Sequence, residues 1–342
     1  MMLATAIEAA LAGQDVDAGV LEAAFGEIMD GEAEPVQIAG LLVALRAKGE
    51  SVEEIVAAAR ALRARASTTK ARAANTIDVC GTGGSGLDTF NISTISAFVV
   101  AGAGVSVAKH GNRAASSRSG SFDVLEALGV RIDLPIATCG KILEEIGIAA
   151  FFARTAHPAF KYVGPVRQQL GVRTLMNCLG PLLNPAGVQH QVVGVYAASL
   201  VEPLAHALMG LGATRALVVH GSDGLDEITT TGTTAACSAL DGKVECFSID
   251  PAELGIALCS PADIRGGSPD ENAEVVRAVL GGETGPKRDI VTLNAGAALW
   301  VAGASPDLAG GIKVADESID SGAASGKLEE LIKATCIAGE AL

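Results

Sequence analysis

The stretch from residue 76 to residue 123 restricts the possible folds more than any other part of the chain. The apolar run 76–80 predicts a β-strand, a glycine-rich turn follows it, and the apolar segment that begins near Asn91 predicts a helix. A further apolar run at 105–108 predicts a second strand. Two strands that flank one helix form a βαβ unit with a right-handed crossover, so this region indicates an α/β fold.

The alternation of helices and strands continues after residue 120. We predict strands at 148–152, 191–196 and 215–219, and helices at 121–128, 138–146, 200–211, 270–281, 288–302 and 325–338. Short β-type runs fill 227–249, and Asp241-Gly242 is a possible hairpin turn between them. The predicted fold class is α/β: a small helical domain plus a larger α/β domain with a central, mostly parallel sheet.

The first 66 residues follow a helical pattern. Apolar side chains recur every three or four residues, which predicts about four helices, and Ser51 with Glu54 forms a capping-box signature. We predict a helical domain over 1–70, joined in space by part of 165–187, and an α/β domain over 75–342. Hinge segments are expected near 70–75 and 156–190, where prolines interrupt the second segment. A structural or dimerisation role is favoured for the helical domain over a catalytic one.

Charge and cysteine usage argue against several classes of protein. The formal net charge of −14 disfavours a nucleic-acid-binding surface, although a local basic loop can still bind a small phosphorylated ligand. The seven cysteines are scattered without CxxC spacing, so neither a disulfide framework nor a zinc site is indicated, and a cytoplasmic location is expected. We expect no signal peptide and no membrane span, because the apolar runs are short.

Two loops in the stretch 81–123 have the composition of a polyanion site. The turn Gly81-Thr82-Gly83-Gly84 precedes a predicted helix start at Asn91, which can cap that helix and leave N–H groups free for an anion. The basic run 109–113 follows the next strand, at the end where α/β proteins bind ligands. Each loop alone could be an ordinary turn, a simple cap or a solvated basic loop. His110 could be a general base, but a structural hydrogen-bonding role is favoured.

Acidic and basic residues elsewhere are consistent with such a ligand. Asp226 and Glu227 follow a strand-like run, and Mg²⁺ is often held by one or two carboxylates together with substrate phosphates. Alone, an adjacent Asp-Glu pair is usually only solvated charge. Arg167 and Arg173 lie in the proline-rich segment, where either could pair with a substrate carboxylate or form an interdomain ion pair.

The chain resembles the anthranilate phosphoribosyltransferase family over nearly its whole length. The resemblance rests on several motifs in order: EAEPVQIAGLLVALRAKGE, GTGG, NIST, KHGNRAASSRSG, HPAFKYVGPVR, LGPLLNPA and HGSDGLDEIT. It implies a small helical domain that forms a homodimer, a larger α/β domain, and an active site between them near the hinge. It also implies transfer of phosphoribose from phosphoribosyl pyrophosphate to the amine of anthranilate, the second step of tryptophan synthesis, with two Mg²⁺ ions per monomer and no protein nucleophile.

The resemblance assigns roles to individual residues. The Mg²⁺ ligands would be Ser93, Asp226 and Glu227, and anthranilate would contact Gly81, Asn112 and Arg167. Phosphoribosyl pyrophosphate would contact Gly81, Gly84, Thr89, Asn91, Ile92, Ser93, Thr94, Lys109, His110, Gly111, Asn112, Arg113, Ala114, Ala115, Ser116, Ser117 and Ser121.

Two positions depart from the family pattern. The glycine-rich turn usually ends in Asp, and here it ends in Ser85, which can still hydrogen-bond a phosphate or a Mg²⁺-bound water but lacks the negative charge. We therefore predict an altered Mg²⁺ dependence. Phe160 stands where the family often has Met, a milder change.

Two other functions of related architecture remain open at this point. A pyrimidine nucleoside phosphorylase would share the glycine-rich and lysine-containing loops but would not need the Asp-Glu pair. A nucleic-acid-binding relative is disfavoured by the acidic balance of the chain.

Overall fold

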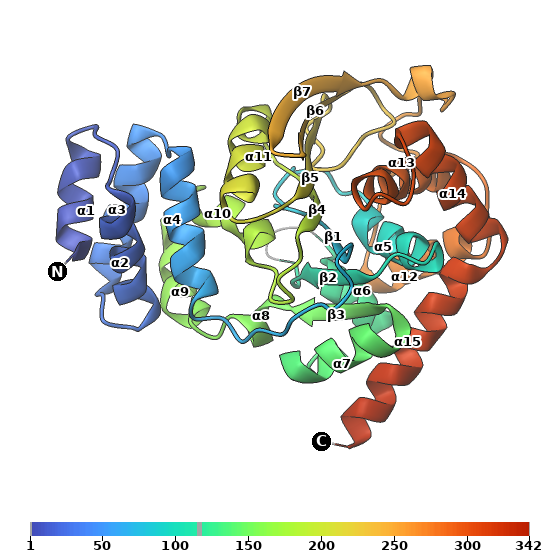
Figure 1. The fold of residues 1–342 in the computed structure, drawn as a ribbon, viewed down its shortest axis with the longest axis horizontal. Coiled ribbons are helices and arrows are strands. Elements are labelled where there is room, and N and C mark those ends of the chain that lie inside the picture. Colours follow the sequence, from blue (N-terminus) through green and yellow to red (C-terminus); the bar gives the residue numbers. More distant parts are fainter. Residues whose placement is uncertain (1, 115–117, 342) are drawn as a thin grey trace.

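The computed structural model describes residues 2–114 and 118–341 (Figure 1). Four helices form one end of the molecule, coloured blue in Figure 1: α1 (Met2–Leu11), α2 (Ala18–Met29), α3 (Pro35–Lys48) and α4 (Val52–Arg63). The predicted capping box is confirmed, since Glu54 N–H donates to Ser51 Oγ and Ser51 N–H donates to Glu54 Oε2. The same buried carboxylate accepts from Val16 N–H and pairs with Lys48, so the start of α4 is tied to two other parts of this end.

A seven-stranded sheet lies at the centre of the larger unit, with strand order β3-β2-β1-β4-β5-β6-β7. Its strands are β1 (Ile77–Gly81), β2 (Val107–Gly111), β3 (Ile148–Phe152), β4 (His190–Gly194), β5 (Arg215–Gly221), β6 (Thr234–Leu240) and β7 (Lys243–Ile249). Strands β1 to β5 are parallel, while β6 and β7 pair antiparallel at one edge. The predicted mostly parallel sheet is confirmed. The hairpin turn is also confirmed: Asp241 and Gly242 have φ values of 52° and 77°, the left-handed conformation that a tight hairpin needs.

The remaining helices surround this sheet and connect it to the four-helix end. They are α5 (Ile92–Gly102), α6 (Ser121–Ala127), α7 (Ile136–Ile146), α8 (Ala153–Ala156), α9 (Phe160–Leu170), α10 (Met176–Leu179), α11 (Val201–Gly210), α12 (Pro269–Leu280), α13 (Pro286–Val301), α14 (Leu308–Asp320) and α15 (Ala323–Glu340), with 3₁₀ turns at Gly180–Leu183, Ala198–Leu200 and Pro251–Leu254. Helix α14 was not predicted, because its buried face consists largely of small or polar residues such as Gly311, Ala315 and Ser318. None of the described helices is long and apolar enough to cross a membrane.

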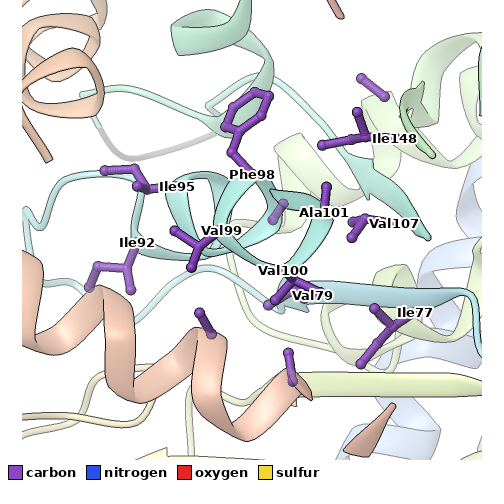
Figure 2. Close-up of a cluster of buried hydrophobic side chains, with 14 of the residues drawn as sticks. Ile77, Val79, Ile92, Ile95, Phe98, Val99, Val100, Ala101, Val107 and Ile148 are labelled. Carbon is purple, nitrogen blue, oxygen red and sulfur yellow. The ribbon is translucent and has the colours of Figure 1, made fainter. Parts of the chain in front are cut away.

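Two hydrophobic clusters lie on the two faces of the sheet. The first contains Ile92, Ile95 and Phe98 of α5 together with the strand residues Ile77 and Val107 (Figure 2). The second cluster joins the cores of α1 to α4 with side chains of 163–183 and with the other face of β4 and β5. Segment 163–183 therefore packs with the four-helix end as well as with the sheet.

One feature of the edge hairpin corrects the sequence analysis. Cys237 and Cys246, for which no disulfide was expected, are disulfide-bonded. Their register on β6 and β7 places them directly opposite each other, with Cα atoms 4.0 Å apart. The scattered spacing of the cysteines carried no signal of this pairing, because hairpin register, and not sequence distance, brings the two together. The other five cysteines are free.

Candidate active site

The strand order reverses between β1 and β4, and ligands of open α/β sheets bind at the carboxyl ends of strands at such a point. Gly81 and Gly194 end these two strands and lie opposite each other in register. The loop after β5 passes directly over them: a Cβ at Gly194 would overlap the carbonyl oxygen of Asp226, and one at Gly81 would lie 2.5 Å from Asp226 Oδ2. Both strands must end in glycine so that the Asp226 segment can approach this closely.

The glycine-rich turn after β1 bonds to the acidic pair. Gly83 N–H donates to Asp226 Oδ2 at 2.8 Å, across 143 residues of sequence. The turn uses positive φ at Gly83, Gly84 and Gly86. Arg173 contacts the same turn. Its guanidinium donates to the Gly84 carbonyl at 2.5 Å and lies over the Tyr196 ring, 4.4 Å from the ring centre. Of the two arginines considered from sequence, Arg173 is thus the one that contacts this turn.

The N-terminus of α5 approaches the same acidic pair. Ser93 N–H donates to Glu227 Oε1 at 3.2 Å, and Lys109 Nζ lies 3.5 Å from Ser93 Oγ. Burial, and next the charge of Asp226, raise the pKa of Glu227 to about 8. The structure therefore brings together Ser93, Asp226 and Glu227, the three predicted metal ligands, although they come from two distant parts of the chain.

Lys109 is buried in the middle of β2, and not after the strand as predicted, and it donates to the Val79 carbonyl at 2.8 Å. The buried Asp78 carboxylate stands on the neighbouring strand, where it accepts from His110 N–H at 3.1 Å and from the Asn184 amide at 2.8 Å. Burial raises the pKa of Asp78 and lowers that of Lys109, and each group's charge opposes the shift of the other. Asp78 and Asn184 were not singled out from sequence, since a lone Asp in an apolar strand has no recognisable motif.

His110 forms part of a buried pair that the sequence did not indicate. Its ring meets His157 edge to face with centroids 5.3 Å apart, and His157 Nε2 bonds the Leu183 carbonyl at 2.9 Å. Burial, and next the neighbouring His157, lower the pKa of His110 to about 3, while burial lowers that of His157 to about 4. A ring that resists protonation this strongly is a poor general base, which favours the structural role.

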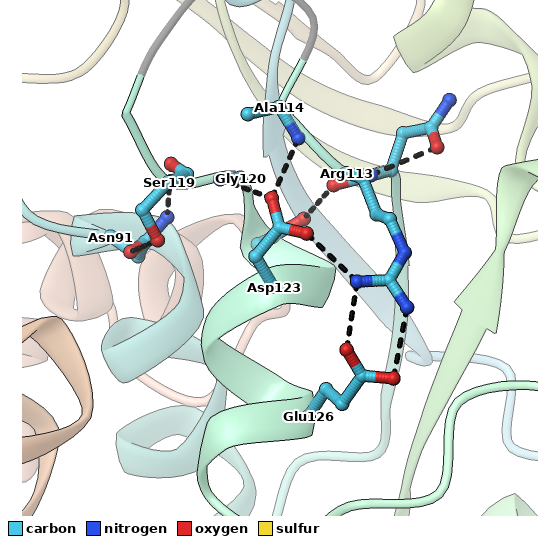
Figure 3. Close-up of polar contacts among 9 residues, drawn as sticks. Asn91, Arg113, Ala114, Ser119, Gly120, Asp123 and Glu126 are labelled. Carbon is cyan, nitrogen blue, oxygen red and sulfur yellow. Dashed lines mark hydrogen bonds and ion pairs between the residues drawn. The ribbon is translucent and has the colours of Figure 1, made fainter. Parts of the chain in front are cut away.

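The loop after β2 is closed at its base by Asp123 of α6 (Figure 3). The Asp123 carboxylate accepts from Ala114 N–H at 2.8 Å and from Gly120 N–H at 2.9 Å. Ser121 Oγ donates to the Asn112 carbonyl. The Arg113 guanidinium pairs with Asp123 and Glu126, so it is directed to α6. The predicted contacts Ala115, Ser116 and Ser117 lie outside the described residues.

Asn91 begins α5, but its side chain makes no capping hydrogen bond, contrary to the sequence prediction. The amide instead donates to the Ser119 carbonyl at 3.3 Å, and its oxygen accepts from Asn272 at 3.0 Å. Asn91 thereby joins the loop after β2 to the start of α12, a bridge between segments that sequence spacing cannot reveal.

The remaining predicted site residues lie in the first turn of α5, in and after the glycine-rich turn, and on α9. Ile92 and Thr94 are buried in the first turn of α5, and Thr89 forms an isolated bridge with Arg265. Ser85 Oγ accepts from Leu87 N–H at 3.4 Å within the glycine-rich turn. Arg167 lies on α9, where burial lowers its pKa; within the described part of the chain, it forms no ion pair with a carboxylate.

Comparison with known proteins places the chain in a family. Residues 4–66 match the helical bundle domain of a glycosyl transferase family, and residues 73–325 match its a/b domain. The chain is 50% identical over 333 residues to an anthranilate phosphoribosyltransferase of Rubrobacter xylanophilus (97% of each chain), and 52% identical over 312 residues to one of Azorhizobium caulinodans (91% and 90%).

Solved structures agree with these matches. The anthranilate phosphoribosyltransferase of Thermus thermophilus superimposes with a TM-score of 0.92 at 44% identity, over 96% of this chain and 99% of that one. The enzyme of Saccharomyces cerevisiae in complex with PRPP and Mg superimposes with a TM-score of 0.90 at 27% identity, over 98% of both chains.

Proposed function

This chain belongs to the anthranilate phosphoribosyltransferase family, and we propose that its site transfers the 5-phosphoribosyl group of phosphoribosyl pyrophosphate to the amine of anthranilate. The products are N-(5-phosphoribosyl)anthranilate and pyrophosphate, in the second step of tryptophan synthesis. The observation that carries this assignment is the meeting of the glycine-rich turn, the start of α5 and Lys109 around the Asp226–Glu227 pair. A nucleoside phosphorylase would not need that acidic pair as metal ligands.

The donor atoms of this centre suit Mg²⁺. Ser93, Asp226 and Glu227 offer only oxygen, and no group of three or more His, Cys, Asp or Glu side chains that could hold a metal occurs among residues 2–114 and 118–341. A cation held by so few protein ligands takes its remaining oxygens from substrate phosphates and water, as Mg²⁺ usually does. When bound, Mg²⁺ neutralises charge that develops on the leaving pyrophosphate. We propose two ions per monomer.

The protein binds the polyanion through backbone N–H groups and one buried cation. The first turn of α5 presents the positive end of its helix dipole, where Ser93 N–H already bonds the Glu227 carboxylate, and the positive-φ glycines of the turn let the backbone approach closely. Lys109 is held by Val79 and balanced by Asp78, so its charge is already oriented before substrate arrives. Pyrophosphate leaves as positive charge develops on the ribose, and the fixed donors stabilise the leaving group.

Arg167 is the proposed partner of the anthranilate carboxylate. A partly buried guanidinium whose pKa is lowered by burial, and which has no carboxylate partner in the described chain, gains much from an anionic ligand. Asn112 and the backbone at Gly81 complete the proposed contacts. The substrates need only be held with the amine facing C1 of the ribose, because positioning supplies a large share of the acceleration.

We also propose that two copies associate through the four-helix end and that the protein works in the cytoplasm. Val36 and Val43 on α3, together with Met2 and Leu11 on α1, are exposed apolar side chains on two helices that pack against each other. The pair Val36 and Val43, two turns apart on one face of α3, is the apolar surface that favours a protein partner. Five of the seven cysteines are free, which favours a reducing compartment, whereas the Cys237–Cys246 disulfide is of a kind that is rare there.

The decisive experiment follows anthranilate fluorescence with the purified protein. We expect the signal to fall only when phosphoribosyl pyrophosphate and Mg²⁺ are both present. An unchanged signal at saturating substrate would overturn the assignment, and phosphorolysis of a pyrimidine nucleoside by orthophosphate would favour the phosphorylase. Size-exclusion chromatography with light scattering tests the dimer, and a Val36→Asp/Val43→Asp variant should elute as a monomer.

A further inference from the structure

The backbone immediately after the acidic pair is held by one buried amide, the side chain of Asn294 on α13. Ile228 N–H donates to Asn294 Oδ1 at 3.0 Å, and Asn294 Nδ2 donates back to the Ile228 carbonyl at 2.8 Å. The same Nδ2 donates to Ile290 within α13 at 2.8 Å. Asn294 thus binds both backbone groups of the residue next to Glu227, in the way that a neighbouring strand would.

This contact is the link between that backbone and a long helix. Some of the other side-chain bonds lie within the loop itself, where Asp223 accepts from Thr229 Oγ1, Thr231 Oγ1 and Leu225 N–H. Others reach distant segments: Asp226 accepts from Gly83 N–H, Glu227 accepts from Ser93 N–H, and Thr230 Oγ1 bonds Cys259 Sγ. Among the described residues, none of these bonds holds the backbone of Ile228, the residue next to Glu227. The pair of bonds from Asn294 does hold it, and it joins this backbone to α13 at a point where both Ile228 and Asn294 are completely buried.

Helix α13 also packs against α5, the helix that carries Ser93. Ser96 Oγ, one turn after Ser93, donates to the Val291 carbonyl of α13 at 3.3 Å. One helix therefore supports both sides of the proposed metal centre, the carboxylate loop through Asn294 and the serine through α5. A sub-ångström change at either contact would alter the distance between Ser93 and the Asp226–Glu227 pair.

We propose that Asn294 is a positioning residue for Mg²⁺: it sets the reach of Asp226 and Glu227 toward Ser93, and so controls how well the centre binds Mg²⁺ with phosphoribosyl pyrophosphate. The inference rests on the proposed function. Mg²⁺ demands near-ideal octahedral geometry, so a displaced carboxylate weakens its binding sharply. Residues that orient metal ligands without touching the metal typically contribute about 10- to 100-fold to metal affinity.

The test compares Asn294→Ser, Asn294→Asp and a control on the same helix. The Ser side chain is too short to bond both groups of Ile228, whereas Asp retains the acceptor for Ile228 N–H but loses both donated bonds. Thr292→Val is the matched control, because Thr292 is buried on α13 and its hydroxyl, within the described chain, bonds Asp289 of its own helix alone. Thermal unfolding of all variants measures the loss of stability separately from function.

Two readouts distinguish positioning from a purely structural role. In calorimetric titrations with phosphoribosyl pyrophosphate at varied Mg²⁺, we expect the Mg²⁺ needed for half-saturation to rise about tenfold or more in both Asn294 variants and to stay within twofold in Thr292→Val. In the metal-free protein, hydrogen exchange of residues 222–231 should be faster in the Asn294 variants only.

The opposite outcomes are equally clear. An unchanged Mg²⁺ requirement in Asn294→Ser or Asn294→Asp, with a lowered melting temperature, would show that Asn294 only stabilises the fold and would overturn the inference. If the unmodified protein itself bound no phosphoribosyl pyrophosphate with Mg²⁺, this result would overturn the proposed function, and the inference that rests on it would fall as well. Should one variant fail to fold, the other still decides the question.

Discussion

The buried pair His110 and His157 predicts that the folded protein loses stability in mild acid. Both rings are about 95% buried, at 5% and 4% exposure, and their pKa values are lowered to about 3 and about 4. In the unfolded chain a histidine titrates near 6.5. Between pH 6.5 and pH 4 the unfolded state therefore binds more protons than the folded state, so the free energy of unfolding falls as the pH falls and reaches its full value above pH 6.5.

The size of the effect depends little on the folded-state pKa values. At pH 5 both rings are still neutral in the folded protein, whereas each is protonated in the unfolded chain, because this pH lies about 1.5 units below the unfolded pKa. Protonation of the unfolded state lowers the free energy of unfolding by about 1.4 kcal/mol per pH unit, which is about 2 kcal/mol per histidine. The pair should thus account for about 4 kcal/mol of lost unfolding free energy between pH 7.5 and pH 5. This is a large share of the stability of an ordinary domain.

Urea unfolding at the two pH values measures this loss. Trp300, the single tryptophan, lies on α13 and reports on the α/β unit by fluorescence. The variant is His157→Gln, whose Nε2 can still donate to the Leu183 carbonyl but which does not titrate. Its stability should fall about 2 kcal/mol less than that of the unmodified chain between pH 7.5 and pH 5. The control is His206→Gln, since the His206 side chain is 43% exposed on α11.

Titration of carboxylates contributes to every one of these proteins alike, so the difference between variants isolates the histidine. Equal losses for His157→Gln and for the unmodified chain would refute the reasoning, because they would mean that His157 gains its proton as readily in the folded protein as in the unfolded one.

Three further substitutions test the site. Gly194→Ala places a Cβ against the Asp226 carbonyl, so binding of phosphoribosyl pyrophosphate with Mg²⁺ should weaken about tenfold or more. The control Gly326→Ala, whose added Cβ meets nothing within 4 Å, should leave this affinity unchanged. Equal calorimetric affinities of the two variants would contradict the steric argument. Ser85→Asp introduces the negative charge that the family usually has at this position, beside the proposed pyrophosphate site, and should lower the Mg²⁺ concentration for half-maximal activity; superimposable titrations would rule this out. Arg167→Leu removes the proposed charge-assisted bond to the anthranilate carboxylate, worth about 1.5–3 kcal/mol. The KM for anthranilate should then rise about 10- to 100-fold while that for phosphoribosyl pyrophosphate stays constant; a parallel rise in both would argue against a carboxylate contact.

Much of the fold follows from local patterns in the sequence. Residues 76–111 form strand, turn, helix and strand because apolar spacing and glycine positions act over a few residues. Asp241-Gly242 makes the hairpin turn for the same reason, since the required φ values depend on those two residues alone. Helix α14 was missed because its small buried side chains form no apolar stripe.

The candidate site shows the limit of such reasoning. Motifs identified Ser93, Lys109, Asp226 and Glu227 as residue types suited to a phosphate and Mg²⁺, and the resemblance to a family assigned their roles. The contacts that unite them, such as Gly83 N–H to Asp226, join segments separated by more than a hundred residues and follow from strand order. Sequence periodicity carries no information about such contacts.

The sequence by itself determined the α/β class, the hairpin turn, the capped helix at Ser51 and the chemical types of the site residues, because each depends on neighbours along the chain. Only the tertiary structure decided that Asn294 holds the backbone beside Glu227, that His110 meets His157, and that burial raises the pKa of Glu227 to about 8. Those properties depend on which distant segments the sheet brings together and on how much water the packed core excludes.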